Sequence, residues 1–133
     1  MILNIRVLTP DKIICSTIAK KIILPGLTGE IGILENHAAL ITALDIGLLR
    51  IKSKDKWIPI ILCGGLAEVD RNQVTILAND IQELTNINFK KATKNLEEAI
   101  LIFNNAKSEK IKLDAAIEVK KATVYLEAIK YLT

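Results

Sequence analysis

The sequence predicts an α+β chain, in which an N-terminal antiparallel β-sandwich is followed by a C-terminal antiparallel α-helical hairpin. All six glycines and all three prolines of the 133 residues lie at or before Gly65, and these residues mark the turns between short strands. From about Phe89 onward, apolar residues recur three and four positions apart, which is the period of a helix. The expected domains are therefore residues 1–86 and 87–133.

Short apolar segments bounded by turn residues define the expected sandwich. Strands are expected at 3–8, 19–24, 47–52, 57–62, 65–69 and 73–77. The polar segment 53–56 and the segment Asp70, Arg71, Asn72 join two pairs of these strands as hairpins. Pro59 has no N–H to donate to a ladder, so we expect it at a sheet edge or at a bulge.

Two apolar stripes define the expected helices. They comprise Phe89, Ala92, Leu96, Ala99, Phe103 and Ala106, and then Ile111, Ala115, Val119, Ala122, Leu126 and Ile129. Ser108 is the expected N-cap of the second helix. Alanines in both stripes permit close approach, which favours an antiparallel hairpin. The helical hairpin is too small to bury much of a core of its own. We therefore expect it to pack against the sandwich or against another protein, and to be able to change partner.

The positive charge of the chain lies on the helical segment. Residues 1–87 hold nine basic and nine acidic side chains, whereas residues 88–133 hold nine lysines and six acids. The prominent lysines are Lys90, Lys91, Lys94, Lys107, Lys110, Lys112, Lys120 and Lys121. They form either a solvated helix face or a binding surface for an acidic partner. In the second case, added salt would weaken the binding of that partner. A net charge of only +3 argues against a dedicated nucleic-acid binder.

A search for catalytic residues finds none. His37 is the only histidine, and Cys15 and Cys63 form no CxxC pattern, so no metal or cofactor site is predicted. The segment "GLTGEIG" lacks the GK[ST] of a phosphate loop. A small enzyme using His37 and Cys63 remains a formal alternative. No apolar run is long enough to span a membrane, and the N-terminus lacks the pattern of a signal or transit peptide.

Three motifs taken in order carry a family resemblance that covers the whole chain. They are "LTPDKII", "GEIGILENHAALITALDIGLLRI" and "GGLAEVDRNQVTILAND", and a segment without glycine or proline follows them. Together they resemble the epsilon subunit of the rotary F-type ATP synthase, and most of all its chloroplast and cyanobacterial branch. An alternative is a free-standing β-sandwich binding module with a helical dimerisation tail.

The resemblance implies a non-catalytic subunit in the central stalk of a proton-translocating ATP synthase. In the family, the sandwich packs on the gamma subunit and rests on the membrane rotor ring, the c ring. The hairpin transiently contacts the catalytic beta subunit and inhibits ATP hydrolysis, so the eight lysines would face an acidic segment of beta. Glu30 and His37 would dock on the ring, although His37 alternatively only caps its own loop. The implied location is the stromal face of the plastid thylakoid membrane, peripherally bound, or else the cytoplasmic face of a bacterial membrane.

The sequence departs from the family at two places. Glu35 and Ala39 stand where prolines are usual, so we expect a looser loop. An ATP-binding "I-D-x-x-R-A" motif of bacterial relatives corresponds to residues 87–92, where Asn88 replaces the Asp and Lys91 replaces the Arg. The carboxylate and the bidentate guanidinium are both absent, so we expect no low-micromolar ATP affinity in a calorimetric titration.

Overall fold

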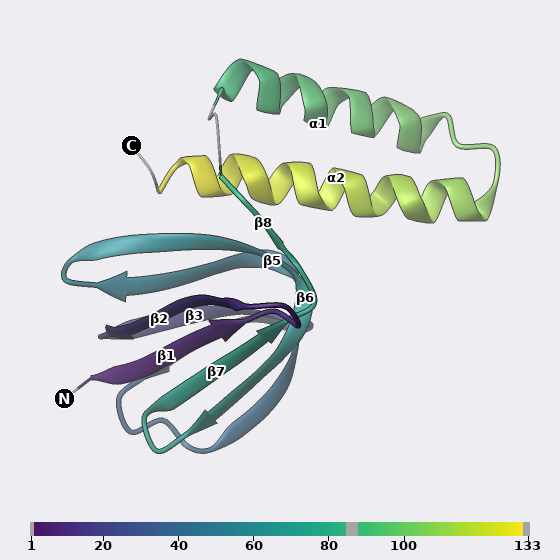
Figure 1. Cartoon of the computed structure of the whole chain (residues 1–133). Coiled ribbons are helices and arrows are strands. Elements are labelled where there is room, and N and C mark those ends of the chain that lie inside the picture. The colour runs from purple at the N-terminus through teal and green to yellow at the C-terminus, as the bar shows by residue number, and fades with distance from the viewer. Residues whose placement is uncertain (1, 85–87, 132–133) are drawn as a thin grey trace. The chain divides into compact units, whose positions relative to one another are not determined.

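The chain divides into two compact units. The computed structural model describes residues 2–84 and 88–131. The units comprise Met1–Glu83 and Leu84–Thr133, and they are a body of strands and a pair of helices (Figure 1). The boundary expected between residues 86 and 87 lies outside the described residues. Each unit is described by itself below.

The first unit contains eight strands. They are β1 (Leu3–Leu8), β2 (Ile13–Ala19), β3 (Lys21–Gly26), β4 (Gly29–Leu34), β5 (Leu40–Ser53), β6 (Lys56–Asp70), β7 (Gln73–Ala78) and β8 (Ile81–Gln82). Their order is β2-β1-β7-β6-β5-β3-β4, with β8 paired to β6. The second unit contains α1 (Phe89–Asn104) and α2 (Glu109–Ile129), which run antiparallel in Figure 1. The predicted α+β class is confirmed.

One strand pair departs from the predicted antiparallel arrangement. β1 pairs with β7 in parallel, whereas the other described pairs are antiparallel. A parallel pair cannot be joined by a tight hairpin, and here five strands separate the partners along the chain. Local sequence patterns reveal hairpins, so they could not reveal this long-range pairing.

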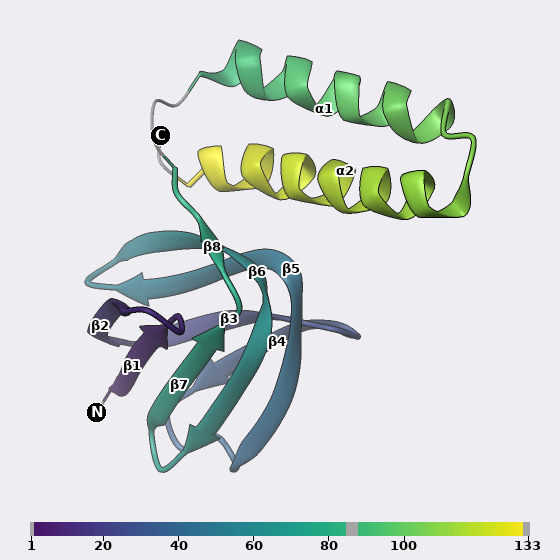
Figure 2. The same ribbon diagram turned by 45° about the vertical axis from the view of Figure 1, so that its right-hand side comes forward.

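Two long strands supply both layers of the sandwich. β5 has 14 residues and β6 has 15, and both curve from one layer into the other (Figure 2). The predicted separate strands at 57–62 and 65–69 are thus one continuous strand. Gly64 (φ +83°) and Gly65 (φ +151°) lie where the partner of β6 changes from β8 to β7. The inward residues of both layers, including Ile5, Leu49 and Ile76, form one buried core.

The predicted hairpins and the prediction for Pro59 are confirmed. The β5–β6 turn at Lys54 and Asp55 has positive φ at both residues, which is the hairpin turn whose twist matches that of the strands. The β6–β7 turn, Arg71 and Asn72, has the same conformation. Pro59 lies opposite β5 on a stretch of β6 that pairs with no other described strand, so its missing donor breaks no ladder.

Side-chain caps start both helices. The Asn88 side chain accepts a hydrogen bond from the Lys91 N–H, and the Ser108 side chain accepts one from the Ile111 N–H at 3.2 Å, as predicted for Ser108. The predicted stripes are buried at Ala92, Ala99, Ala115 and Ile129. However, the first large residue of each stripe is exposed: Phe89 by 61% and Ile111 by 49%. Both lie in the first turn of their helix.

Candidate functional site

Glu30 lies on β4, which is at one end of the strand order. Its carboxylate Oε2 is 2.6 Å from Nη2 of Arg50 on β5. The Glu30 side chain is 68% exposed, whereas the Arg50 side chain is only 14% exposed. The guanidinium is thus held within the sheet surface, while the carboxylate remains accessible to solvent. Glu30 can therefore present one oxygen to a partner while the other stays paired.

His37 lies in the loop between β4 and β5 and is half-buried. Its Nδ1 is 2.7 Å from the Ala38 carbonyl oxygen, so the tautomer that fits has Nδ1–H donating and Nε2 available. The neighbouring Asn36 has φ +63°, and its N–H donates to the Asn72 side chain at 2.7 Å. The loop is thus held against the β6–β7 turn despite lacking the prolines usual in the family.

The structure does not bring Glu30 and His37 together. In the β3–β4 pair, Glu30 lies opposite Pro25, while Leu34, at the other end of β4, lies opposite Lys21. Four residues of strand separate Glu30 from Leu34, which is about 13 Å, and His37 lies beyond Leu34. These residues occupy opposite ends of β4, so a partner that contacts both must cover the length of the strand.

The predicted lysines form separate groups along the hairpin. All eight are exposed except Lys121, which is half-buried. Lys90 and Lys91 lie in the first turn of α1, and Lys110 and Lys112 lie in the first turn of α2. Because the helices are antiparallel, these groups lie at opposite ends of the hairpin, about 24 Å apart. The lysines of the two first turns therefore do not form one cluster.

Helix stability does not explain where these lysines lie. A helix N-terminus carries partial positive charge, so cations there are unfavourable and cations in the last turn are favourable. Both helices have the reverse arrangement, with lysines in the first turn and no basic residue in the last turn. α1 also has no acidic residue in its first turn. The four first-turn lysines therefore make an unfavourable charge contribution to their own helices.

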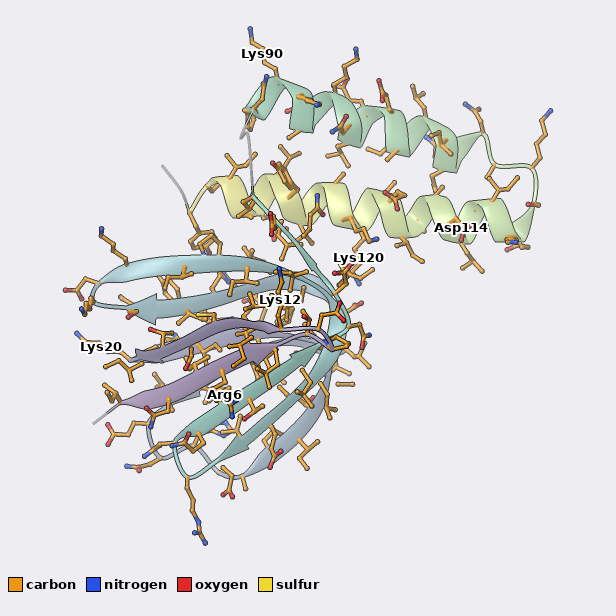
Figure 3. The ribbon with its side chains drawn as sticks, in the orientation of Figure 1. Arg6, Lys12, Lys20, Lys90, Asp114 and Lys120 are labelled. Atoms are coloured by element: carbon orange, nitrogen blue, oxygen red, sulfur yellow. The ribbon has the colours of Figure 1, made fainter. Side chains whose placement is uncertain are left out.

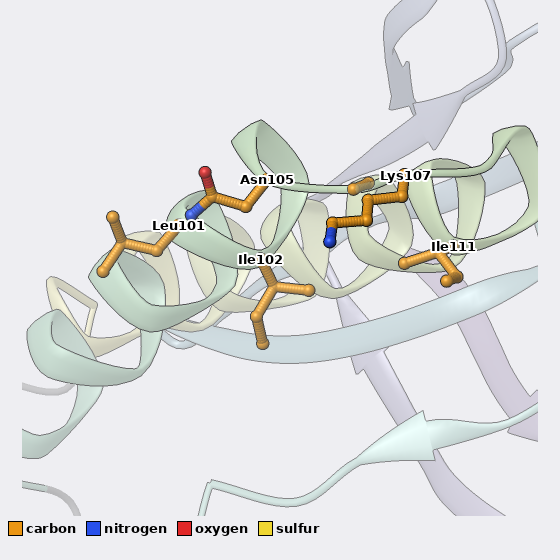
Figure 4. Close-up of a pocket in the computed structure, with 6 residues that line it drawn as sticks. Leu101, Ile102, Asn105, Lys107 and Ile111 are labelled. Carbon is orange, nitrogen blue, oxygen red and sulfur yellow. The ribbon is translucent and has the colours of Figure 1, made fainter.

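An apolar groove lies at the turn between α1 and α2 (Figure 4). Its volume is about 410 Å³, and Leu101, Ile102, Asn105, Ala106, Lys107 and Ile111 line it. Leu101 and Ile102 are 60% and 58% exposed. The sequence analysis did not predict this groove, because it assigned a single apolar stripe to each helix. The signal was the run Ile100–Phe103, which has too many consecutive apolar residues for one stripe.

The cysteines do not form a catalytic arrangement with His37. No disulfide joins Cys15 and Cys63. Burial raises the pKa of the Cys15 thiol, which disfavours the nucleophilic thiolate. The His37 loop leads into Leu40, which lies opposite Val69, and Cys63 is six residues from Val69, or about 20 Å along β6. Among the described residues no group of His, Cys, Asp and Glu could hold a metal ion.

A strand sandwich followed by a helical hairpin defines the class of protein, and comparison with known proteins identifies the family. Residues 2–84 match the family described as "ATP synthase, Delta/Epsilon chain, beta-sandwich domain". The chain therefore belongs to the delta/epsilon chain family of ATP synthases. Within that family, it is 62% identical to "ATP synthase epsilon chain, chloroplastic" of Phaeodactylum tricornutum (strain CCAP 1055/1) over 100% of both chains. The chloroplastic epsilon chain of Porphyra purpurea is 44% identical over 96% of both chains.

Solved structures share this fold. A chain of the Euglena gracilis mitochondrial ATP synthase (OSCP/F1/c-ring, rotational state 1) superposes with a TM-score of 0.84 at 22% identity. That match covers 96% of this chain and 81% of the other. A chain of the Tetrahymena thermophila mitochondrial ATP synthase (central stalk/c-ring) gives a TM-score of 0.60 at 16% identity, covering 95% of both chains. Neither described helix is long and apolar enough to cross a membrane.

Proposed function

We propose that this chain is the epsilon subunit in the central stalk of a proton-translocating ATP synthase. It couples rotation to ATP synthesis and inhibits ATP hydrolysis through its C-terminal helices, without catalysing a reaction itself. The observation that carries the proposal is the 62% identity to a chloroplastic epsilon chain with full coverage of both chains. The division into a strand unit and a separate helical unit supports it, because a rigid head and a movable arm need such a boundary.

The sandwich, residues 1–86, binds the gamma subunit and rests on the c ring. Glu30 and His37 dock on the ring from opposite ends of β4. The support for Glu30 is its exposed carboxylate, which a mostly buried guanidinium holds in place. The support for His37 is that its Nδ1 contacts the Ala38 carbonyl oxygen of its own loop, which leaves Nε2 for a partner.

The helical hairpin, residues 87–133, is the regulatory arm and transiently contacts the catalytic beta subunit. Its lysines face an acidic segment of that subunit. The support is the exposure of seven of these lysines and the first-turn positions of four, where a cation destabilises the free helix: Lys90, Lys91, Lys110 and Lys112. An acidic partner converts this unfavourable charge into attraction, so the arm is more stable when bound than when free.

The chain acts in a plastid, at the stromal face of the thylakoid membrane, as a peripheral protein. The chloroplastic relatives at 62% and 61% identity over 100% of this chain support the plastid location.

Truncation after Asn86 tests the regulatory arm. The compact strand unit ends at Glu83 and the family match ends at residue 84, so the shortened chain keeps every element of the sandwich. We expect it to bind gamma as the full chain does and to raise ATP hydrolysis by the reconstituted catalytic head. The measurements are co-purification with gamma and steady-state ATPase rate. A truncated chain that binds gamma but leaves hydrolysis unchanged would contradict the inhibitory role.

A charge-neutral substitution tests the docking residues. Glu30→Gln preserves the shape of the side chain and removes its charge, and His37→Ala removes the imidazole. We expect the double variant to fold and bind gamma, yet to lower proton-coupled ATP synthesis in reconstituted vesicles. Asp55→Asn, which removes an exposed carboxylate from the β5–β6 turn outside β4, is the control and should leave synthesis unchanged. Normal synthesis by the double variant would rule out the docking role of both residues.

A further inference from the structure

Asn72 connects three segments that are distant in the sequence. It is the second residue of the β6–β7 turn, and its backbone carbonyl oxygen accepts the Asn4 N–H of β1 at 2.8 Å. Its side-chain Oδ1 accepts the Asn36 N–H at 2.7 Å, and its Nδ2 donates to the Asn36 Oδ1 at 3.5 Å. Asn36 belongs to the loop at 35–39, which joins β4 to β5. The start of β1, the turn and the loop therefore meet at one asparagine.

The contact between Asn36 and Asn72 is here called the asparagine clasp. Both residues have a left-handed backbone, with φ at +63° and +64°. Asparagine adopts this conformation more readily than other residues with a side chain, and glycine adopts it freely. Glycine would therefore satisfy the backbone at either position, but it could not supply the side-chain bonds. The clasp is thus a contact that the two turn conformations do not themselves require.

Asn72 is the firmly held side of the clasp. Val69 and Val74 pair directly beyond the β6–β7 turn, and each is only 1% exposed in the core. The bond from Asn4 also ties the turn to β1. No residue of the loop at 35–39 lies in a strand. The clasp therefore fixes the loop to the sandwich, since the turn is part of the sheet and the loop is not.

His37 follows Asn36 directly, so the clasp acts beside the proposed docking side chain. The His37 N–H donates to the Leu34 carbonyl oxygen at 3.2 Å, and its Nδ1 is 2.7 Å from the Ala38 carbonyl oxygen. These local contacts set the shape of the loop. The clasp instead ties the loop to a turn 36 residues further along the chain.

The loop depends on such a tie because residues 35–39 include no proline, so no ring restricts their backbone. We propose that Asn72 is a positioning residue, which holds the β4–β5 loop so that His37 meets the membrane rotor ring in one geometry. This inference rests on the proposed function, because it names the residue that keeps a docking side chain in place.

The test separates the side chain of Asn72 from its backbone. Asn72→Gly keeps the left-handed conformation and removes the acceptor, whereas Asn72→Asp keeps an acceptor for the Asn36 N–H. Asp55→Gly is the matched control, because Asp55 has the same φ of +64° at the same position of the β5–β6 turn. Its carboxylate lies 3.7 Å from the Nζ of Lys20, which Figure 3 labels. Circular dichroism and urea unfolding verify that each full-length variant folds.

Hydrogen exchange in the free chain measures the clasp directly. Nuclear magnetic resonance gives the exchange rate of the Asn36 N–H, and we expect Asn72→Gly to raise this rate about fivefold, since the amide loses one hydrogen bond. Asn72→Asp and Asp55→Gly should exchange at close to the parent rate. An unchanged rate in the folded Asn72→Gly variant would overturn the positioning role and leave the proposed function intact.

A double-mutant cycle shows whether Asn72 acts through His37. Proton-coupled ATP synthesis is measured in vesicles that contain the synthase assembled with each full-length variant. We expect Asn72→Gly to lower the rate about two- to fivefold, in proportion to the lost hydrogen bond, and Asn72→Asp to restore most of it. In a chain that already carries His37→Ala, Asn72→Gly should have no further effect.

Each other result of the cycle contradicts a particular step. A loss of equal size with and without His37→Ala would show that Asn72 acts by another route, and a normal rate with Asn72→Gly would show that docking does not need the clasp. Either result refutes the positioning role alone. A normal rate with His37→Ala refutes docking by His37 and the positioning role together. Failure of the parent chain to restore synthesis to an assembly that lacks it would overturn the proposed function as well.

Discussion

At the scale of single residues, Gly65 is the position where β6 most strictly requires glycine. Its φ is +151°, and a Cβ built there would lie 2.3 Å from the Leu77 carbonyl oxygen. Because that oxygen belongs to the backbone of β7, it cannot move aside without disturbing the ladder. Alanine would therefore introduce both backbone strain and a steric clash.

We predict that Gly65→Ala destabilises the sandwich more than Gly29→Ala does. Gly29 has a comparable φ of +139°, but an added Cβ would meet nothing within 4 Å. The strained φ costs about 1–3 kcal/mol at either position, and overpacking adds about 1–3 kcal/mol at Gly65 alone. Urea unfolding of the two variants measures the difference directly. Equal midpoints would show that β7 moves aside without loss.

At the scale of secondary-structure elements, the start of α2 depends on one hydroxyl. Ser108 Oγ accepts the Ile111 N–H at 3.2 Å, so it satisfies a donor that has no partner within the helix. Glu109 also lies in the first turn, beside two lysines. Glu109 therefore offsets part of the unfavourable lysine charge at this end of the helix.

We predict that Ser108→Ala lowers the stability of the helical unit by about 1 kcal/mol. Ser108→Asp is the control, because aspartate caps equally well and its charge also suits the helix N-terminus. The readout is the thermal loss of helical circular dichroism in the full chain. If alanine and aspartate variants melted together, the hydroxyl would contribute nothing to the stability of α2.

Local patterns predicted the hairpin turns, the Ser108 cap and the two helices, because their causes are local, but they did not predict β2, β4 or β8. The turns at 54–55 and 71–72, the Ser108 cap and the helical stripes all depend on residues within a few positions of one another. The parallel β1–β7 pair and the joining of two predicted strands into β6 depend on distant segments. No short window of sequence contains that information.

The sequence named candidate site residues, but it did not predict how the fold arranges them in space. The family resemblance grouped Glu30 and His37 as docking residues, yet the length of β4 separates them. The lysines read as one basic arm, yet the antiparallel helices place them in separate groups. The sequence did not group the exposed residues Leu66 and Leu77, because they lie on different strands. Only the register of the sheet makes them neighbours.

At the scale of the whole molecule, the two units differ in charge. Basic and acidic side chains balance in residues 1–87, whereas lysines outnumber acids by nine to six in residues 88–133. The proposed arm should therefore engage its partner electrostatically, while the sandwich, whose charges balance, should bind with less dependence on salt. Attraction between exposed charges is screened over about 8 Å at physiological ionic strength. Salt should thus release the arm before it releases the sandwich.

Charge reversal in the arm tests this difference in salt dependence between the two units. We predict that Lys107→Glu, Lys110→Glu and Lys112→Glu, combined in the full chain, raise ATP hydrolysis by the reconstituted head nearly as much as truncation does. The three glutamates repel the acidic segment of beta that the lysines attract, while the unaltered sandwich stays bound to gamma. The measurement is the ATPase rate across a series of salt concentrations, which should rise with salt for the parent chain and stay flat for the variant. The same three positions changed to arginine keep their charge and should retain salt-sensitive inhibition. A glutamate variant that inhibits like the parent chain at every salt concentration would show that these lysines do not hold the arm on the head.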